Sequence, residues 1–354
     1  MTIYATPDAS AEGTAPGPPG GPGPMVSHVV PCYNARRYLR ECLASIVATA
    51  TEPYEIVVVD DGSTEEIEDV VREFEPHARY VRQHNQGPGA ARNTGIRETR
   101  GPYIRFVDAD DVLLSAEAAQ AQLEMMEADP EIGLIYGQSI VIDADGRPQG
   151  TRRPRFASAS YVRPGAEELN ELLLFNYITT SSTVVRRSVV ERAGCFRTDL
   201  RSGQDYELWL RMARISSFGY LDRPVVAYRK HNQGVTARKT LAQRQHLAEA
   251  IDQMFLDPDF ARRYAGVRAR IEARRRWKAV TVAYRTGQMN VVRRSVLREL
   301  PRSIRQRDWQ LAGDYGWLLA RAVWPNAVRE PLRGAFRRVK LRSLADKISP
   351  ADPV

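Results

Sequence analysis

Three carboxylates, Asp108, Asp110 and Asp111, follow the segment Tyr103–Val107, which is predicted to be a short strand. In an extended backbone, side chains two residues apart point the same way, so Asp108 and Asp110 are expected to project together from the end of a strand. Two like charges held this close repel each other unless a cation lies between them. Oxygen ligands suit hard divalent cations such as Mg²⁺ or Mn²⁺. Acidic turns after strands are also common as solvated turns, so the meaning of the cluster depends on the neighbouring loops.

Two other polar segments follow predicted strands. Pro31-Cys-Tyr-Asn34 ends the strand Val26–Pro31, and Asp60-Asp-Gly-Ser63 ends the apolar run Glu55–Asp60. The Gly-rich segment Gln86–Gly95 opens a helix, where backbone N–H groups can receive phosphate oxygens. In a parallel sheet, ligands bind outside the carboxyl ends of the strands. Together these loops predict a nucleotide site.

Strands and helices alternate with short connections as far as the Asp cluster, which predicts a parallel, doubly wound sheet. The segment Ile132–Ile142 and a returning strand then form a hairpin, so the second half of the sheet is expected to be mixed. Ser63 or Thr64 is expected to cap a helix that runs to about Phe74. Further on, Ile178–Arg186 has the Thr and Val content of a strand.

A helix is predicted over Gln204–Ile215, with Leu208 and Trp209 on its apolar face. Asp205 lies three and four residues before them, which places it on the same inward face at the helix start.

Composition is ordinary for a globular protein. The 354 residues are 43% hydrophobic and 27% charged, enough for one large domain or two. The first 24 residues are rich in Pro and Gly and are expected to be disordered. Three cysteines without a Cys-x-x-Cys pair argue against a disulfide framework or a zinc site. The apolar runs are too short for a membrane span and no secretory signal pattern is present, so a cytoplasmic protein is expected.

Charge is unevenly distributed. After Val235 the chain has 26 Lys and Arg against 11 Asp and Glu, a net charge of about +15. Such an excess favours a polyanionic partner. Aromatic and Arg residues in Leu311–Trp324 fit either a helix at a membrane surface or a helix packed against the protein or another subunit. No basic-aromatic nucleic-acid motif is present, so no nucleic-acid partner is expected.

Seven motifs occur in a characteristic order: Val30–Asn34, Val58–Thr64, Gln86–Gly95, Phe106–Asp111, Gly194–Phe196, Gly203–Met212 and Tyr228–His231. In this order and spacing the chain resembles the family 2 glycosyltransferases. The resemblance implies a GT-A fold, an α/β architecture with a Rossmann-like, mostly parallel sheet and a mixed second half, followed here by an α-helical C-terminal extension. It covers about residues 25–234.

The predicted domain organisation combines the resemblance, which covers about residues 25–234, with the composition of the two ends of the chain. After the Pro/Gly-rich segment 1–24, a glycosyltransferase domain is expected over 25–234. Its nucleotide-binding half is 25–111 and its acceptor-binding half is 112–234. A basic helical region would follow over 235–354.

The implied activity is transfer of a sugar, with inversion, from a nucleoside-diphosphate donor to a hydroxyl acceptor. A UDP-sugar is the expected donor, and the acceptor a saccharide or a lipid-linked molecule in polysaccharide or glycolipid synthesis. Mg²⁺ or Mn²⁺ is the implied cofactor. The expected location is cytoplasmic, and attachment to the inner face of the cell membrane is one of the two roles open for the C-terminal region.

Roles carried over from the family fall on matching positions. Asp205 corresponds to the catalytic base, although Gln204 replaces the Glu that often precedes it. The metal would be held by Asp110, Asp108 and His231, and His231 could equally be an incidental residue of a basic loop. The donor-binding residues would be Pro31, Tyr33, Asn34, Asp60, Asp61, Arg92 and Asp108. Within this set Asp61 would bind the base, and it also fits a simple turn role.

Two other functions share part of this pattern. A nucleotidyltransferase also carries Asp residues at a strand end but would have no use for Asp205. A catalytically silent nucleotide-sugar-binding or membrane-surface module would need the binding loops alone.

Overall fold

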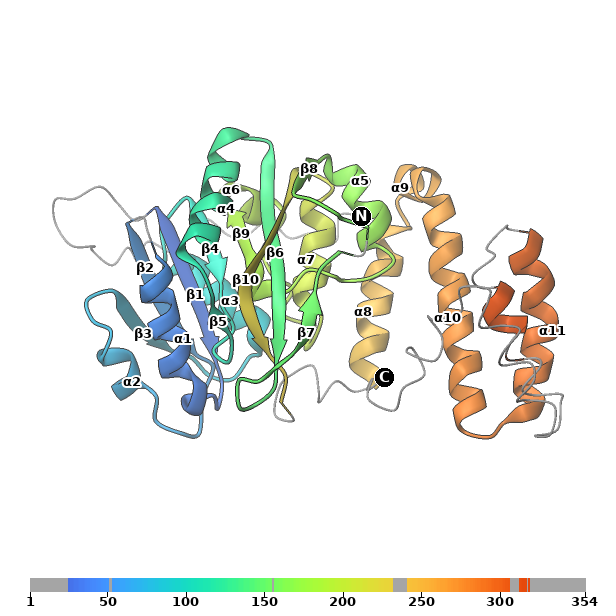
Figure 1. Ribbon diagram of the computed structural model, residues 1–354, viewed down its shortest axis with the longest axis horizontal. Helices are drawn as coiled ribbons and strands as arrows, with labels where there is room; N and C mark the ends of the chain where they lie inside the picture. The colour runs from blue at the N-terminus through green and yellow to red at the C-terminus, as the bar shows by residue number, and fades with distance from the viewer. Residues whose placement is uncertain are drawn as a thin grey trace. The chain divides into compact units, whose positions relative to one another are not determined.

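The computed structural model describes residues 25–50, 53–154, 156–231, 241–305, 312–316 and 318 (Figure 1). They form two compact units. The first lies within residues 1–162, 178–201 and 215–229, and the second within 163–177, 202–214 and 230–354. The expected disorder of residues 1–24 falls outside the described residues. The expected domain boundary after residue 234 stays a prediction.

One mixed sheet forms the first unit, in the order β3-β2-β1-β4-β9-β6-β10-β5, with β7 beside β6 and β8 beside β10. The strands are β1 Val26–Cys32, β2 Tyr54–Asp60, β3 Ala78–Arg82, β4 Tyr103–Phe106, β5 Val112–Leu113, β6 Ile132–Ile142, β7 Pro148–Arg152, β8 Tyr161–Arg163, β9 Thr183–Arg186 and β10 Ser217–Arg229. The strands β3, β2, β1 and β4 are parallel, whereas β9 is antiparallel to both β4 and β6. The predicted parallel half and mixed second half are both confirmed.

The helices of the first unit are α1 Arg36–Thr49, α2 Glu68–Arg72, α3 Pro88–Arg97, α4 Ala116–Ala128 and α6 Arg187–Arg192. The alternation of buried residues in β2 explains how helices cover both faces of the sheet. Ile56 and Val58 pack in one core with α1 and α2, while Val57 and Val59 pack with Ala91 of α3. A strand buried on both faces has the continuous apolar sequence seen in β2.

The start of α2 differs from the prediction. The helix begins at Glu68, and Ile67 stands at its N-cap without a side-chain hydrogen bond. The hydroxyl of Ser63 instead accepts a hydrogen bond from the backbone N–H of Asn34, and Thr64 donates to the Asn34 side chain. Both expected capping residues are therefore used to join two loops.

Two other elements are shorter than predicted. The strand expected over Ile178–Arg186 is extended only in β9, because Thr180–Ser182 forms a 3₁₀ turn. Hydroxyls in this segment donate to nearby backbone carbonyls, which competes with strand pairing. Helix α7, Gln204–Met212, ends before Ile215, which is 39% exposed.

The second unit is helical. Besides α7 it contains α5 Gly165–Leu172, α8 Leu241–Met254, α9 Pro258–Arg263, α10 Ala265–Arg285 and α11 Met289–Arg305. Tyr315 and Leu318 are buried in a core with residues of α10 and α11, and Tyr315 meets Trp277 edge to face at 4.9 Å. These two residues therefore pack inside the unit, whereas Trp317 and Trp324 lie outside the described residues. Among the described helices, none is long and apolar enough to cross a membrane.

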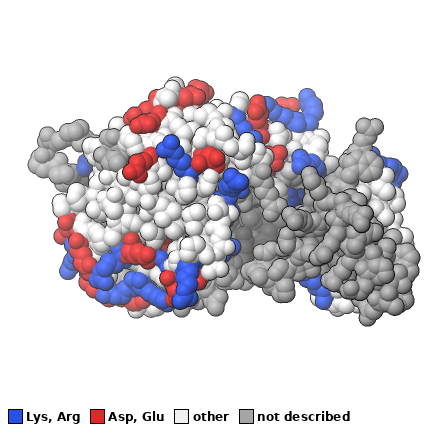
Figure 2. All heavy atoms as spheres, in the orientation of Figure 1, with Lys and Arg blue, Asp and Glu red and all other residues white. Residues whose placement is uncertain are grey.

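Acidic and basic side chains are interspersed on the face of the first unit shown in Figure 2. No large area of one sign is visible there. The basic excess of the sequence belongs to the residues that follow Val235.

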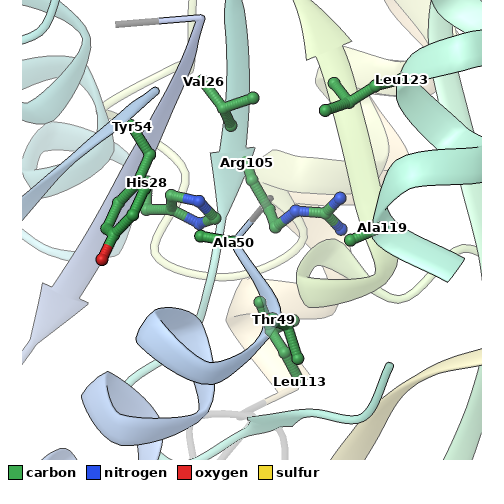
Figure 3. Close-up of a pocket in the computed structure, with 9 residues that line it drawn as sticks. All are labelled: Val26, His28, Thr49, Ala50, Tyr54, Arg105, Leu113, Ala119 and Leu123. Carbon is green, nitrogen blue, oxygen red and sulfur yellow. The ribbon is translucent and has the colours of Figure 1, made fainter. Parts of the chain in front are cut away.

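A buried cation lies beside a buried histidine in the sheet of the first unit. His28 and Arg105 are register partners on β1 and β4, and their side chains reach the same small cavity of about 20 Å³ (Figure 3). Arg105 is 2% exposed and donates to the Gln122 side chain. The Nδ1 atom of His28 has no hydrogen-bond partner among the described residues. Burial, reinforced by the charge of Arg105, lowers the pKa of His28 to about 3.

This histidine should make the fold sensitive to acid. Because the folded protein holds His28 neutral while the unfolded chain protonates it near pH 6.5, stability should fall as the pH drops from 6.5 toward 3. The slope is about 1.4 kcal/mol per pH unit from this one group. His28→Phe keeps a ring against Tyr54 and removes the titration, so urea unfolding at pH 6 and pH 4 should differ less in the variant than in the wild type.

His77→Phe is the matched control, since His77 also stacks on Tyr54 but is exposed. An unchanged acid slope in His28→Phe would show that other groups control acid unfolding.

Candidate active site

The loops predicted to meet do so at one edge of the sheet. Because β2, β1 and β4 are parallel neighbours, the residues that follow them emerge at the same carboxyl edge (Figure 1). Cys32 at the end of β1 pairs in register with Asp60 at the end of β2. Strand β4 ends at Phe106, which pairs in register with Val29 of β1. The loop that carries Asp108 follows directly after it.

Hydrogen bonds hold the loops after β1 and β2 together. Asn34 has a left-handed backbone, with φ of 51°, and its side-chain oxygen accepts from the backbone N–H of Thr64 at 2.9 Å. Its own N–H donates to Ser63 at 3.0 Å. Beside this joint Tyr33 is 49% exposed, so its ring is available to a ligand. Pro31, by contrast, lies within β1 and pairs with Val59.

Asp60 and Asp61 are both buried, and the carboxylates of both accept hydrogen bonds from backbone N–H groups. Asp60 accepts from the Ser63 N–H at 2.8 Å and the Tyr80 hydroxyl at 2.7 Å, and it pairs with Arg82 at 3.3 Å. The carboxylate of Asp61 accepts hydrogen bonds from the Gly-rich loop and the residues before it: Gln83 Nε2, Gln86 N and Gly87 N. These contacts position the entrance to α3. A contact of Asp61 with a nucleotide base remains a prediction.

Helix α3 brings a cation to the Asp cluster. The buried Arg92 donates from Nη2 to Oδ1 of Asp108 at 2.5 Å, and its guanidinium lies 5.4 Å from the ring centre of Phe196. Its Nε–H is buried and has no partner among the described residues. Asn93, the next residue, exchanges two hydrogen bonds with the backbone of Phe196. Arg92 is thereby fixed against Asp108.

Beneath the cluster, Asp111 joins three segments. Ser181 donates to it at 2.5 Å and also accepts from the Asp108 N–H at 3.0 Å. The backbone N–H of Arg229, at the end of β10, donates to the other Asp111 oxygen at 2.9 Å. Burial, together with the charges of Asp110 and Asp108, raises the pKa of Asp111 well above its ordinary range. The motif comparison gives Asp111 no role. In the structure it fixes the loop that carries the other two aspartates.

The Arg229 side chain completes this support. It donates to the Asp110 carbonyl at 2.9 Å and pairs with Glu41 of α1 at 2.7 Å. Ser181 and Glu41 are supporting residues that sequence reasoning does not identify. Ser181 belongs to a segment that reads as a plain strand, and Arg229 lies within a family motif without a role of its own.

The carboxylates of Asp108 and Asp110 fit a divalent cation. Asp108 and Asp110 offer carboxylate oxygens, and a cation beside them would offset the repulsion between their charges. Within the described residues, however, no group of three or more His, Cys, Asp or Glu side chains is placed so that it could hold a metal ion. An ion held by one or two carboxylates takes its remaining ligands from phosphate oxygens and water, as Mg²⁺ usually does.

The proposed base, Asp205, and the third proposed metal ligand, His231, belong to the second unit. Asp205 is in the first turn of α7, is half-buried, and precedes the fully buried Leu208 and Trp209. Glu207 is buried and pairs with Arg211 at 2.7 Å, which engages its carboxylate within the helix. His231 is the last described residue before residue 241 and is partly exposed. The roles of Asp205 and His231 remain predictions.

The mixed sheet, with its acidic loop at the carboxyl edge of the parallel strands and a helical C-terminal region, is a GT-A-type fold. It is similar to the crystal structure of S. aureus TarS 1-349 in complex with UDP, with a TM-score of 0.58 and 19% identity over 84% of this chain and 81% of that chain. For the complex with UDP-GlcNAc the TM-score is 0.59, with 18% identity over 84% and 82%. At these identities the similarity shows the fold.

Residues 27–194 match the family described as Glycosyl transferase family 2, which confirms the family that the order of the motifs predicts. An uncharacterized glycosyltransferase of Rickettsia felis is 29% identical over 219 residues, which are 59% of this chain and 35% of the relative. Chondroitin synthase of Escherichia coli is 24% identical over 237 residues, 65% of this chain and 32% of the relative. The chain thus spans about a third of the length of these two relatives.

Proposed function

We propose that the protein is a glycosyltransferase that moves a sugar, with inversion, from a nucleoside-diphosphate donor to a hydroxyl group of a saccharide or lipid-linked acceptor. The observation that carries the proposal is the arrangement of Asp108, Asp110 and Arg92 at the carboxyl edge of the parallel strands. A UDP-sugar is the expected donor, supported by the similarity to TarS, which was crystallised with UDP and UDP-GlcNAc. The relationship to chondroitin synthase supports a role in polysaccharide synthesis.

Asp110 and Asp108 would hold Mg²⁺ or Mn²⁺ in this proposal, with His231 as a further candidate ligand. When bound, the ion would neutralise charge on the donor diphosphate. Arg92 orients Asp108 through the hydrogen bond from its Nη2 atom. The loops of Tyr33, Asn34 and Asp61 would border the nucleoside.

Asp205 supplies the proton chemistry. In a single displacement, an acceptor oxygen forms a bond to the anomeric carbon while the bond from that carbon to the diphosphate oxygen breaks. The acceptor hydroxyl loses its proton to the Asp205 carboxylate, and the nucleoside diphosphate leaves with the bonding electrons. Attack on the face opposite the leaving group inverts the configuration.

The cellular setting is part of the proposal. An excess of about 15 positive charges after residue 235 supports a location at an anionic membrane surface, where a lipid-linked acceptor would be found.

A donor panel tests the proposed reaction. The full chain is incubated with UDP-, GDP- and dTDP-sugars, with Mg²⁺, with Mn²⁺ or with EDTA, and release of the nucleoside diphosphate is measured. We expect metal-dependent release from one nucleotide class, with a UDP-sugar first, because hydrolysis is the slow background reaction of such a site. With pyrophosphate added to accept the nucleotidyl group, release of sugar 1-phosphate would instead indicate nucleotidyl transfer. Tight donor binding without either product would indicate a silent binding module.

A further inference from the structure

A cavity of about 370 Å³ lies within the second unit, bordered by α7, α8, α10 and the residues that follow α5. Pockets that bind small ligands measure about 300–1,000 Å³ and are mostly apolar with a few polar groups. The apolar part of this wall includes Leu174, Ile251, Ile271 and Trp277. The cavity is therefore large enough, and apolar enough, to take a hydrocarbon chain.

The charged groups of the wall have one sign. Arg274, Arg275 and Lys278 line the cavity from one side of α10, and no Asp or Glu is among its described lining residues. Arg275 pairs with Asp252 of α8 at 2.8 Å, and the guanidinium of Arg274 lies 4.0 Å from the centre of the Phe175 ring. Phe175 is 39% exposed, so this cation-aromatic pair lies where the cavity meets solvent. The wall thus combines an apolar interior with basic groups that would attract an anion.

The same cavity borders the helix that carries the proposed base. Tyr206, next to Asp205, lines the cavity, and its hydroxyl donates to the Leu172 carbonyl at the end of α5. The N-cap of α7 also packs on the α8 wall: Gly203 has φ of 78°, and a Cβ there would lie 2.5 Å from a methyl group of Leu247. The start of α7 and the cavity wall are therefore built from one set of contacts.

We propose that this cavity binds the hydrocarbon chain of an anionic amphiphile, an alkyl or prenyl phosphate that forms the lipid part of the acceptor. The inference rests on the proposed function, because it is the role of Asp205 that places the acceptor at α7. The apolar wall removes hydrocarbon from water, and the basic side of α10 pairs with the phosphate. A neutral chain of equal length would gain only the first of these contacts.

Binding is tested by titrating the full chain with decyl phosphate below its micelle concentration, followed by calorimetry and tryptophan fluorescence. Decyl maltoside and inorganic phosphate are the comparison probes. We expect saturable binding of decyl phosphate, at least about 10-fold weaker binding of decyl maltoside, and no measurable binding of inorganic phosphate. Equal affinity for the two decyl compounds, or no saturable binding, would overturn the proposal.

Two pairs of variants locate the site. Ala248→Trp fills the cavity and should weaken decyl phosphate at least about 10-fold, whereas Ala279→Trp, an exposed α10 residue outside the lining, should not. Lys278→Met should weaken decyl phosphate but leave decyl maltoside unchanged, and Arg270→Met is its exposed control. Circular dichroism establishes that each variant is folded. Undiminished binding in both folded cavity variants would place the amphiphile elsewhere and refute the assignment.

The experiments distinguish an error in the cavity assignment from an error in the proposed reaction. If donor release is absent in the panel but decyl phosphate binds as expected, the reaction is wrong and the cavity assignment stands as a binding site. If donor release is present and decyl phosphate does not bind, the cavity assignment alone is wrong.

Discussion

Asp205→Asn should lower sugar transfer by about 10²–10⁴-fold while the dissociation constant for UDP stays unchanged. The amide keeps the size of the side chain and its place in the first turn of α7 but cannot accept the acceptor proton. Turnover with the donor identified by the panel, and calorimetric titration of UDP, give the two values. A fall in the rate without a change in UDP affinity is the signature of a group that acts on the acceptor.

Glu207→Gln is the matched control, because Glu207 lies on the same first turn. Its carboxylate is buried and paired with Arg211, so the substitution should lower thermal stability more than it lowers the catalytic rate of the folded enzyme. If Asp205→Asn retains full turnover, the base assignment is wrong, and the nucleotidyltransferase interpretation becomes the better one.

Asp110→Ala should reduce turnover by at least about 100-fold and weaken UDP binding only when Mn²⁺ or Mg²⁺ is present. The substitution removes a carboxylate that we propose as a direct metal ligand, whereas the backbone of Asp110 remains held by Arg229. Calorimetry with UDP in Mn²⁺ and in EDTA isolates the metal-dependent part of the binding.

The chain provides its own control for this experiment. Asp143-Ala-Asp145 repeats the tripeptide Asp108-Ala-Asp110 in an exposed turn after β6, where Asp145 pairs loosely with Arg37 at 3.6 Å. Asp145→Ala should leave UDP affinity unchanged in both conditions. A metal-dependent loss of equal size in Asp145→Ala and Asp110→Ala would contradict a specific site at Asp110.

These two tripeptides show why the local sequence alone could not define the site. Both are Asp-Ala-Asp segments that follow a strand, and either reads as an acidic turn. Position decides between them: the first follows β4 in the parallel half, beside the loops of β1 and β2, and the second closes the β6–β7 hairpin. The order of the surrounding motifs singled out Asp108 and Asp110, and the topology gives the physical reason.

What the sequence by itself determined is the alternation of strands and helices, the parallel half of the sheet, the family and the set of loops at its carboxyl edge. Apolar periodicity and turn residues are local, so they can be recognised without knowing the fold. Strand β6 begins and ends where this pattern predicts, at Ile132 and Ile142.

Only the tertiary structure decided which polar side chains hold the site together. Asp111, Ser181 and Arg229 are separated by tens of residues and meet because β9 and β10 enter the mixed half of the sheet next to the parallel half. The pairing of Arg92 with Asp108 depends in the same way on how α3 packs across β1. Such contacts join residues far apart in sequence, and no local pattern encodes them.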